Sequence, residues 1–291
     1  MDCNQHNGQG WSLVLEGGAM RGMFTCGVID VMMEHDLWPE ALIGVSAGAA
    51  FGCNYKSRQR GRGLRYNQRF AGEPRFCSIS SLVRTGDLFN AQFAYHDVPK
   101  LYDVFDGEAF GANPMRFFAV CTDVESGKAV YKELSQADDE AYDWIRASAS
   151  MPLASRPVRL GTQLLLDGGV ADSIPLEHFE RMGYRRNIVV LTQPEGYRKK
   201  STKLMPLMKL ALRHHPNMVQ AMKDRPTMYN AELDYVAQAE SQQRCLVIRP
   251  KEKLPIGHIS HNPAQMQLVY DIGRQTAMQR MEEILRFVST D

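Results

Sequence analysis

The sequence lacks any apolar run long enough to cross a bilayer. Its longest apolar runs, such as Ala41–Val45 and Leu164–Leu166, have the length of strands in a protein core, whereas a membrane helix needs about 20 apolar residues. The first six residues have neither a basic flank nor an apolar stretch, so we expect no signal peptide. These absences predict a cytoplasmic protein, with at most peripheral contact to a membrane.

The chain also lacks a net charge. Its 34 Lys and Arg residues nearly balance 33 Asp and Glu residues, which leaves a net charge of +1 over 291 residues. A dedicated nucleic-acid-binding protein is normally strongly basic, so we expect no nucleic-acid partner. With 44% hydrophobic residues, the composition also excludes an intrinsically disordered chain.

Cysteine is sparse and follows no metal-binding pattern. The six cysteines are far apart, none forms C-x-x-C, and none has a histidine at zinc-ligand spacing. We therefore expect reduced thiols, as in the cytosol. His214 and His215 are adjacent, and adjacent side chains in a helix or strand point apart. We therefore expect neither a metal nor another cofactor.

Apolar periodicity predicts an α/β fold. Strands are predicted at 11–15, 41–45, 117–121, 129–132, 163–166, 188–192 and 245–248. Helices are predicted at 23–35, 138–149, 176–182, 217–239 and 263–288, and the small residues after position 46 predict one more. No linker or repeat divides the chain. We expect a single domain over 1–291, with a core at about 11–190 and additional C-terminal helices and a strand at about 200–291.

The segment Gly44–Gly48 reads Gly-Val-Ser-Ala-Gly and lies between a predicted strand and a predicted helix. The G-x-S-x-G pattern is typical of a nucleophile elbow, in which a sharp turn lifts the Ser46 hydroxyl clear of the sheet. Glycine at both ends avoids collisions between a Cβ atom and the neighbouring backbone. The pattern alone is also compatible with a small-residue turn that only packs closely.

A glycine-rich loop, Gly17–Gly22, follows the first predicted strand and reads Gly-Gly-Ala-Met-Arg-Gly. Successive N–H groups in such a loop converge on an anion. The loop matches neither a P-loop nor a dinucleotide fingerprint, so near a nucleophile it favours an oxyanion hole. Taken alone, it is also compatible with a tight turn that needs glycine for its geometry.

Asp167 ends another predicted strand and is followed by two glycines. A carboxylate at this position can act as a general base if it lies within hydrogen-bond reach of a hydroxyl group. An ordinary Asp-Gly turn is the alternative that the segment by itself leaves open.

Together, in this order, the three motifs resemble those of the patatin-like phospholipases, in particular the bacterial members. The resemblance extends from about Trp11 to Ile188 and includes the block Ala147–Pro152, which leads to the Asp167 strand. It implies a three-layer α/β/α sandwich around a mostly parallel sheet. It also implies a Ser–Asp dyad without a catalytic histidine.

By this resemblance, Ser46 is the nucleophile, Asp167 is the general base, and the N–H groups of Gly17, Gly18 and Ala19 form the oxyanion hole. The supporting motif positions are Arg21, Gly22, Gly44, Gly48, Gly168 and Gly169. The family usually has three consecutive glycines where this chain has Ala19 in third place. Alanine keeps the N–H donor unless the position requires a positive φ. The implied function is hydrolysis of fatty acyl esters of glycerolipids or phospholipids, with an acyl lipid as substrate.

Two other functions stay open. An α/β-hydrolase triad would combine Ser46 and Asp167 with His258 or His261, in the chain order of that fold. However, that fold usually has several strands before its elbow, and here only about thirty residues separate the first strand from Ser46. A non-catalytic lipid- or partner-binding module would keep the fold without the reaction.

Positive charge is concentrated in one segment. Residues 181–225 contain eleven Lys and Arg residues but only two acidic ones, and include the apolar stretch Leu204–Leu212. A cationic segment with apolar faces can lie on an anionic membrane surface. We expect a lid or a membrane-docking element, with an ordinary solvated basic face as the alternative. The oligomeric state is left open.

Overall fold

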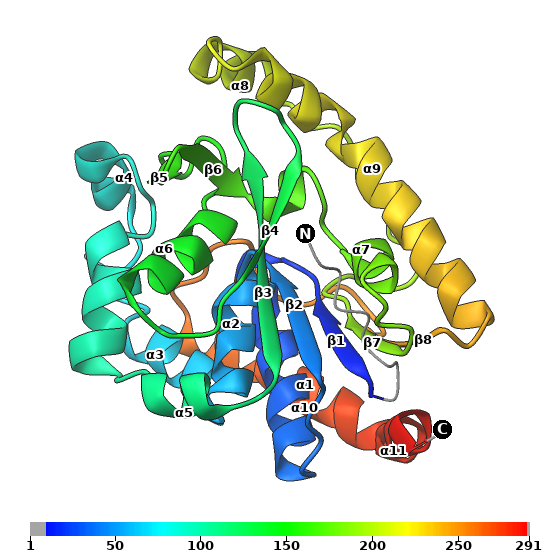
Figure 1. Ribbon diagram of the computed structural model, residues 1–291. Helices are drawn as coiled ribbons and strands as arrows, with labels where there is room; N and C mark the ends of the chain where they lie inside the picture. The colour runs from blue at the N-terminus through cyan, green and yellow to red at the C-terminus, as the bar shows by residue number, and fades with distance from the viewer. Residues whose placement is uncertain (1–9, 290–291) are drawn as a thin grey trace.

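The computed structural model describes residues 10–289 and confirms a three-layer α/β/α sandwich (Figure 1). Within these residues, eight strands form one mostly parallel sheet. Its parallel part consists, in spatial order, of β3 (Arg116–Asp123), β2 (Ala41–Val45), β1 (Ser12–Leu15), β7 (Asn187–Val190) and β8 (Cys245–Ile248). The antiparallel part consists of β4 (Ala129–Glu133), β6 (Gln163–Asp167) and β5 (Val158–Leu160).

Strands β2 and β6 meet end to end along one edge of β3. Strand β2 pairs with residues 116–120 of β3, and β6 pairs with residues 121–123. Strand β4 pairs with residues 118–122 and occupies the other edge. As a result, Val45 and Asp167 lie opposite the consecutive residues Val120 and Cys121. The residue after Val45 and the last residue of β6 are thereby brought together, although they are far apart in the sequence.

Alternation along the strands supplies a core on each face of the sheet. Leu13 and Leu15 of β1 belong to the larger apolar cluster, which also includes residues of the helices on that face. Those helices are α1 (Gly22–Glu34), α2 (Ala47–Lys56), α3 (Arg62–Arg69), α5 (Gly107–Ala112), α6 (Asp139–Ser148), α10 (Pro263–Gln279) and α11 (Met281–Ser289). Val14 faces the opposite side, which is covered by α7 (Leu176–Arg181) and α9 (Pro216–Ser241).

The C-terminal part packs directly on the N-terminal part. Helix α10 lies against α1 at two glycines: a Cβ atom at Gly27 would lie 2.1 Å from the Tyr270 carbonyl oxygen, and one at Gly273 would lie 2.1 Å from that of Phe24. Strand β8, from the same part of the chain, pairs with β7 in the central sheet. The C-terminal elements α10 and β8 therefore belong to the same helical layer and the same sheet as the N-terminal elements.

The predicted helix over 263–288 was wrong as a single element, because the structure has α10 and α11 with a break at Arg280. The guanidinium group of Arg280 bonds the Val247 carbonyl oxygen of β8 and the Glu283 carboxylate. These contacts accompany the break between the two helices, at a point where the apolar periodicity of the sequence would predict one continuous helix. The prediction also missed α3, α4 (Ile79–Thr85), the π-helical segment η2 (Phe93–Tyr102), α5, α8 (Met205–Ala211) and β5. Five of these six elements have only three to eight residues, so they present few apolar repeats.

Two further findings concern the apolarity of the helices and the state of the cysteines. Among residues 10–289, no helix has both the length and the apolar character that a bilayer crossing requires. The cysteines at positions 26, 53, 77, 121 and 245 are buried free thiols, and Cys3 lies outside the described residues.

Candidate active site

Ser46 occupies a sharp turn between β2 and α2. Its φ of 54° and ψ of −118° are unusual for a residue with a side chain. A Cβ atom at Gly44 would lie 2.5 Å from the Gly48 backbone, and one at Gly48 would lie 2.3 Å from the Leu15 carbonyl oxygen. Both distances are far below contact, so the turn requires glycine at the two positions of the motif.

A buried hydroxyl group holds this strained turn in place. The N–H of Ser46 donates to Ser148 Oγ at 2.9 Å, and the Ser148 hydroxyl donates to the Val120 carbonyl oxygen at 2.6 Å. Ser148 ends α6 and is fully buried. The sequence placed Ser148 only inside the block that precedes β6, and nothing in that pattern indicated this bridge. Because the Ser46 N–H is bonded here, it is not a free donor toward a ligand.

Asp167 lies at the end of β6 with only 1% of its surface exposed. Its Oδ1 accepts the Gly169 N–H at 2.8 Å. The Ser46 hydroxyl lies close enough to the carboxyl group to lower its pKa. Oδ2 has no well-formed hydrogen bond to any described residue, so the contact with Ser46 is looser than a complete hydrogen bond. Gly168 is required here, because a Cβ atom would lie 2.1 Å from the Val120 carbonyl oxygen.

Burial dominates the electrostatics of Asp167. It raises the pKa of the carboxyl group above its ordinary value of 3.8, and the Arg225 guanidinium is the strongest opposing influence. Lys199 acts in the same direction as Arg225. Burial and the nearby Arg225 in turn lower the pKa of Lys199 to about 8. Part of the basic segment 181–225 therefore faces this site.

The glycine-rich loop lies directly beside the nucleophile position. A Cβ atom at Gly17 would lie 2.9 Å from Ser46 Cβ, and one at Gly18 would lie 2.6 Å from Thr192 Oγ1. Within residues 10–289, the N–H groups of Gly17, Gly18 and Ala19 donate to no acceptor. The loop thus presents free backbone donors next to the Ser46 turn.

Ala19 has a φ of 50°, in the region that glycine adopts most readily. The position therefore has a positive φ, which alanine adopts at a cost of about 1 kcal/mol, and the Ala19 N–H is nevertheless kept as an unbonded donor. The following residues form the 3₁₀ turn η1 (Ala19–Arg21), in which the Arg21 N–H bonds the Gly18 carbonyl oxygen at 3.1 Å. Gly22 then begins α1, where a Cβ atom would lie 2.6 Å from the Phe51 ring.

The two histidines of the triad alternative do not join this group. His258 Nε2 lies 3.2 Å from Arg21 Nη1, and His261 Nδ1 lies 2.7 Å from the Ala71 carbonyl oxygen. In the described chain, neither side chain hydrogen-bonds Ser46 or Asp167. Loss of solvation and the Arg21 guanidinium lower the pKa of His258.

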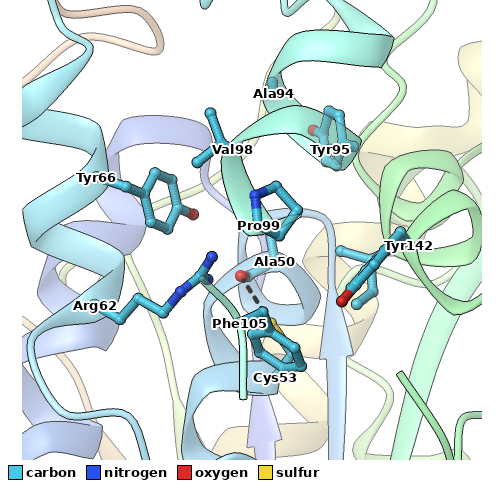
Figure 2. A pocket seen from close by; sticks show the side chains of 11 residues that line it. Ala50, Cys53, Arg62, Tyr66, Ala94, Tyr95, Val98, Pro99, Phe105 and Tyr142 are labelled. Carbon is cyan, nitrogen blue, oxygen red and sulfur yellow. Dashed lines mark hydrogen bonds between the residues drawn. The ribbon is translucent and has the colours of Figure 1, made fainter. Parts of the chain in front are cut away.

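An apolar cavity of about 60 Å³ opens one helical turn beyond Ser46 (Figure 2). Ala50 and Cys53 of α2 form its floor, and the Ala50 N–H bonds the Ser46 carbonyl oxygen at 3.0 Å. Side chains from α3, η2 and α6 complete its wall, including Tyr66, Tyr95 and Tyr142, together with Phe105 from the loop after η2. At about 30 Å³ per molecule, this volume corresponds to roughly two water molecules.

The sequence matches the family model of the patatin-like phospholipases over residues 13–179. The chain belongs to the patatin-like phospholipase family. This confirms the resemblance seen in the motifs. A second family model, a domain of unknown function (DUF6363), matches residues 215–289.

Relatives of this patatin-like chain include the uncharacterized protein YjjU of Escherichia coli K12. It is 31% identical over 200 residues, which cover 63% of this chain and 52% of that protein. Lysophospholipase NTE1 of Debaryomyces hansenii is 25% identical over 185 residues, covering 61% of this chain and 11% of that protein. Lysophospholipase nte1 of Aspergillus niger is 24% identical over 304 residues, covering 96% of this chain and 18% of that protein. The chain thus spans about half of the E. coli protein and less than a fifth of these fungal ones.

Among solved structures, the crystal structure of VipD from Legionella pneumophila is similar at a TM-score of 0.45 and 12% identity. The match covers 94% of this chain and 67% of that one.

The patatin-like match contains all three glycine motifs but ends at residue 179. Lys199, Arg225 and His258 follow later in the chain. Both cations near Asp167, Lys199 and Arg225, therefore come from beyond the patatin-like match.

Proposed function

We propose that this chain is a serine acyl hydrolase of the lipase or phospholipase A type, which cleaves fatty acyl esters of glycerolipids or phospholipids. Ser46 is the nucleophile, and Asp167 is the general base. The observation that carries this proposal is that strand pairing brings Ser46, on a strained turn, next to the buried Asp167 carboxyl group, whose Oδ2 has no hydrogen-bond partner among the described residues. Family membership and the lysophospholipase relatives support the same class of reaction.

The reaction follows from these groups. Ser46 Oγ attacks the ester carbonyl carbon while its proton moves to the free Asp167 Oδ2, and the carbonyl oxygen becomes an oxyanion. The unbonded N–H groups of Gly17, Gly18 and Ala19 stabilise that charge. When the intermediate collapses, Asp167 returns the proton to the leaving alcohol, and an acyl-Ser46 ester remains. Asp167 then takes a proton from the attacking water, and the fatty acid departs as the Ser46 hydroxyl is restored.

A carboxylate is an adequate base here because of its surroundings. An exposed aspartate is too weak a base to deprotonate a hydroxyl group efficiently near neutral pH. Burial raises the pKa of Asp167, which increases its affinity for the proton that Ser46 gives up. The same burial lowers the local dielectric constant and so strengthens electrostatic interactions within the dyad.

The apolar cavity beside α2 supports an acyl chain as the group that is bound. Its lining is largely aromatic and aliphatic, and it begins one turn from the nucleophile (Figure 2). Its volume of about 60 Å³ suits a short acyl segment. Short-chain p-nitrophenyl esters are therefore the first substrates to test, followed by a screen of lipid classes.

Covalent labelling tests whether the chain is an enzyme or a binding module. We expect a fluorophosphonate probe to label the full chain in a 1:1 ratio, since an activated serine attacks phosphorus as it attacks a carbonyl carbon. Intact-mass spectrometry and peptide mapping would locate the adduct at Ser46. Heat-denatured protein serves as the unreactive control. An unlabelled native protein that hydrolyses no ester would support the non-catalytic alternative.

We also propose that α8 docks on an anionic membrane surface. Leu204, Leu207 and Leu210 are three residues apart and expose 53%, 51% and 61% of their surface, so they form one apolar row. Lys203 and Lys209 flank this row. Exposed leucines among lysines are typical of an interfacial helix.

The inward face of α8 connects this row to the site. Met208 and Leu212 are buried in an apolar cluster with Leu166 and Val170, which flank the Asp167 turn. A helix that docks through its outer leucines would thereby bring the Asp167 turn close to the lipid surface.

The docking proposal predicts a loss of vesicle binding on substitution of the apolar row. We expect Leu207→Glu/Leu210→Glu to bind anionic phosphatidylglycerol vesicles roughly tenfold more weakly, because two buried contacts are lost and two negative charges are added. Co-sedimentation at low and high salt measures this. Met278→Glu/Leu285→Glu is the matched control, because it adds the same two charges at exposed apolar positions of α10 and α11, far from α8 in Figure 1. Equal binding of both variants, or binding independent of anionic lipid, would contradict docking.

A further inference from the structure

The inward face of α9 carries ionisable groups where its pattern calls for apolar ones. The buried residues of this helix lie three, four or seven positions apart, at Met218, Met222, Tyr229, Val236 and Ala239. Arg225 and Glu232 fill the two remaining positions of the same stripe. A charge on a packed helix face is costly unless it has partners. The partners of these two residues are therefore informative.

Arg225 reaches the turn that carries Asp167. Its Nε donates to the Gly169 carbonyl oxygen at 2.6 Å, and a Cβ atom at Gly169 would lie 3.3 Å from its Nη2. The N–H of the same glycine bonds Asp167 Oδ1 at 2.8 Å. Gly169 therefore connects the guanidinium group to the carboxyl group. Its carbonyl oxygen accepts from Arg225, and its N–H donates to Asp167.

Tyr229 and Glu232 hold the neighbouring backbone. The Tyr229 hydroxyl donates to the carboxylate of Glu16, the residue that immediately precedes the glycine-rich loop. That carboxylate also accepts the Thr192 N–H at 2.6 Å. Glu232 accepts the N–H groups of Ser173 and Ile174, each at 3.1 Å, just after the Asp167 turn. Three residues on one face of α9 therefore contact both loops of the site.

Building on the proposed function, we propose that the inward face of α9 positions both loops of the dyad site, with Arg225 as the positioning residue for Asp167. The role falls on a helix within the match to the domain of unknown function, residues 215–289. That segment then acts as a structural support for catalysis carried out by the patatin-like part.

Arg225 also sets the charge around Asp167. The charged groups that face Asp167 are Arg225 from α9 and Lys199 from the loop after β7, and both favour its ionised form. The other titratable neighbours are Tyr95 of η2 and Cys121 of β3, whose own pKa values are raised by burial and by Asp167, so both are neutral when Asp167 ionises. Loss of Arg225 therefore raises the pH at which Asp167 becomes an active base.

The test compares the full chain with Arg225→Gln, Arg225→Lys and Lys223→Gln. We expect Arg225→Gln to lower kcat by roughly 10- to 100-fold at neutral pH with little change in KM, because the Asp167 turn loses its support. We also expect the acid limb of the kcat/KM profile to move to higher pH. Arg225→Lys keeps the charge, and its acid limb should stay near that of the wild type. Lys223→Gln removes a charge from the exposed face of α9 two residues away and should change neither quantity.

Three outcomes would overturn this role of α9. They are a wild-type acid limb in Arg225→Gln, a kcat within twofold of wild type in that variant, or an equal shift in Lys223→Gln. Should Arg225→Gln fail to fold, Tyr229→Phe decides instead, because it removes only the hydroxyl that binds Glu16. A kcat within twofold of wild type in that variant would also overturn the proposal. Full activity in Ser46→Ala would instead refute the proposed function, so the two failures are distinguishable.

Discussion

Ser46→Ala is expected to lower kcat/KM for a p-nitrophenyl ester by about 10⁴- to 10⁶-fold while the chain stays folded. The substitution removes the oxygen atom that forms the acyl-enzyme in the proposed mechanism. It keeps the N–H that bonds Ser148 Oγ at 2.9 Å, so the turn and its anchor to α6 are preserved. Steady-state hydrolysis and fluorophosphonate labelling, with circular dichroism as the folding check, measure this result. Activity within tenfold of wild type in a folded Ser46→Ala chain would remove Ser46 from the mechanism.

Ser46→Gly provides a control that also removes the hydroxyl group but is expected to raise the stability of the chain. The φ of 54° and ψ of −118° at this position are strained for any residue with a Cβ atom, whereas glycine adopts them freely. We expect this variant to be as inactive as Ser46→Ala but more stable by about 1–3 kcal/mol. Thermal unfolding of both variants and the wild type separates the loss of the hydroxyl from the relief of backbone strain. A less stable Ser46→Gly chain would show that the turn is not strained.

Asp167→Asn is expected to lower kcat by about 10⁴-fold. The amide oxygen can still accept the Gly169 N–H, which now bonds Oδ1 at 2.8 Å. The amide nitrogen replaces the free Oδ2, and it cannot accept a proton from Ser46. The shape of the turn is therefore kept while the base is lost. Hydrolysis rates and the rate of fluorophosphonate labelling should fall together. Wild-type labelling in this variant would show that another group activates Ser46.

Although Asp167→Asn is expected to lose activity, it is not expected to lose stability. Burial raises the folded-state pKa of Asp167 above its ordinary value of 3.8, so the folded chain holds this proton more tightly than the unfolded chain. Stability is then lost as the pH rises through the folded-state pKa, and the loss persists at neutral pH. Asparagine carries no such penalty. We expect Asp167→Asn to be at least as stable as the wild type at pH 7, with the difference shrinking toward pH 4. A lower stability at pH 7 would contradict this sign.

The local parts of the fold were predictable from sequence. Strands β2 and β8 begin and end where apolar runs predict, because both are buried on both faces and flanked by breaks in the pattern. The turn at Ser46 was predictable for a similar reason, since its glycines are fixed by contacts within a few residues or with the adjacent strand.

The assembly of the site was less accessible to sequence reasoning. That Asp167 lies beside Ser46 depends on β6 pairing antiparallel with β3 just beyond the end of β2, and no local pattern encodes such a pairing. Only the resemblance to a family linked the two residues. Arg225 was counted as one cation in a basic segment, although its spacing from Met222 and Tyr229 placed it on the inward stripe of α9. That spacing is the signal that was available.

Because β2 and β6 meet end to end, the distance between Ser46 and Asp167 can change substantially only when a residue is added to or removed from a strand. Val45 and Asp167 are fixed opposite successive positions of β3 by main-chain hydrogen bonds, so side-chain repacking in the core can adjust their separation only slightly. Removing or adding one residue in Gln163–Leu166 would instead turn Asp167 to the opposite face of the sheet. Evolution can therefore vary the apolar residues of β6 widely, but its length hardly at all.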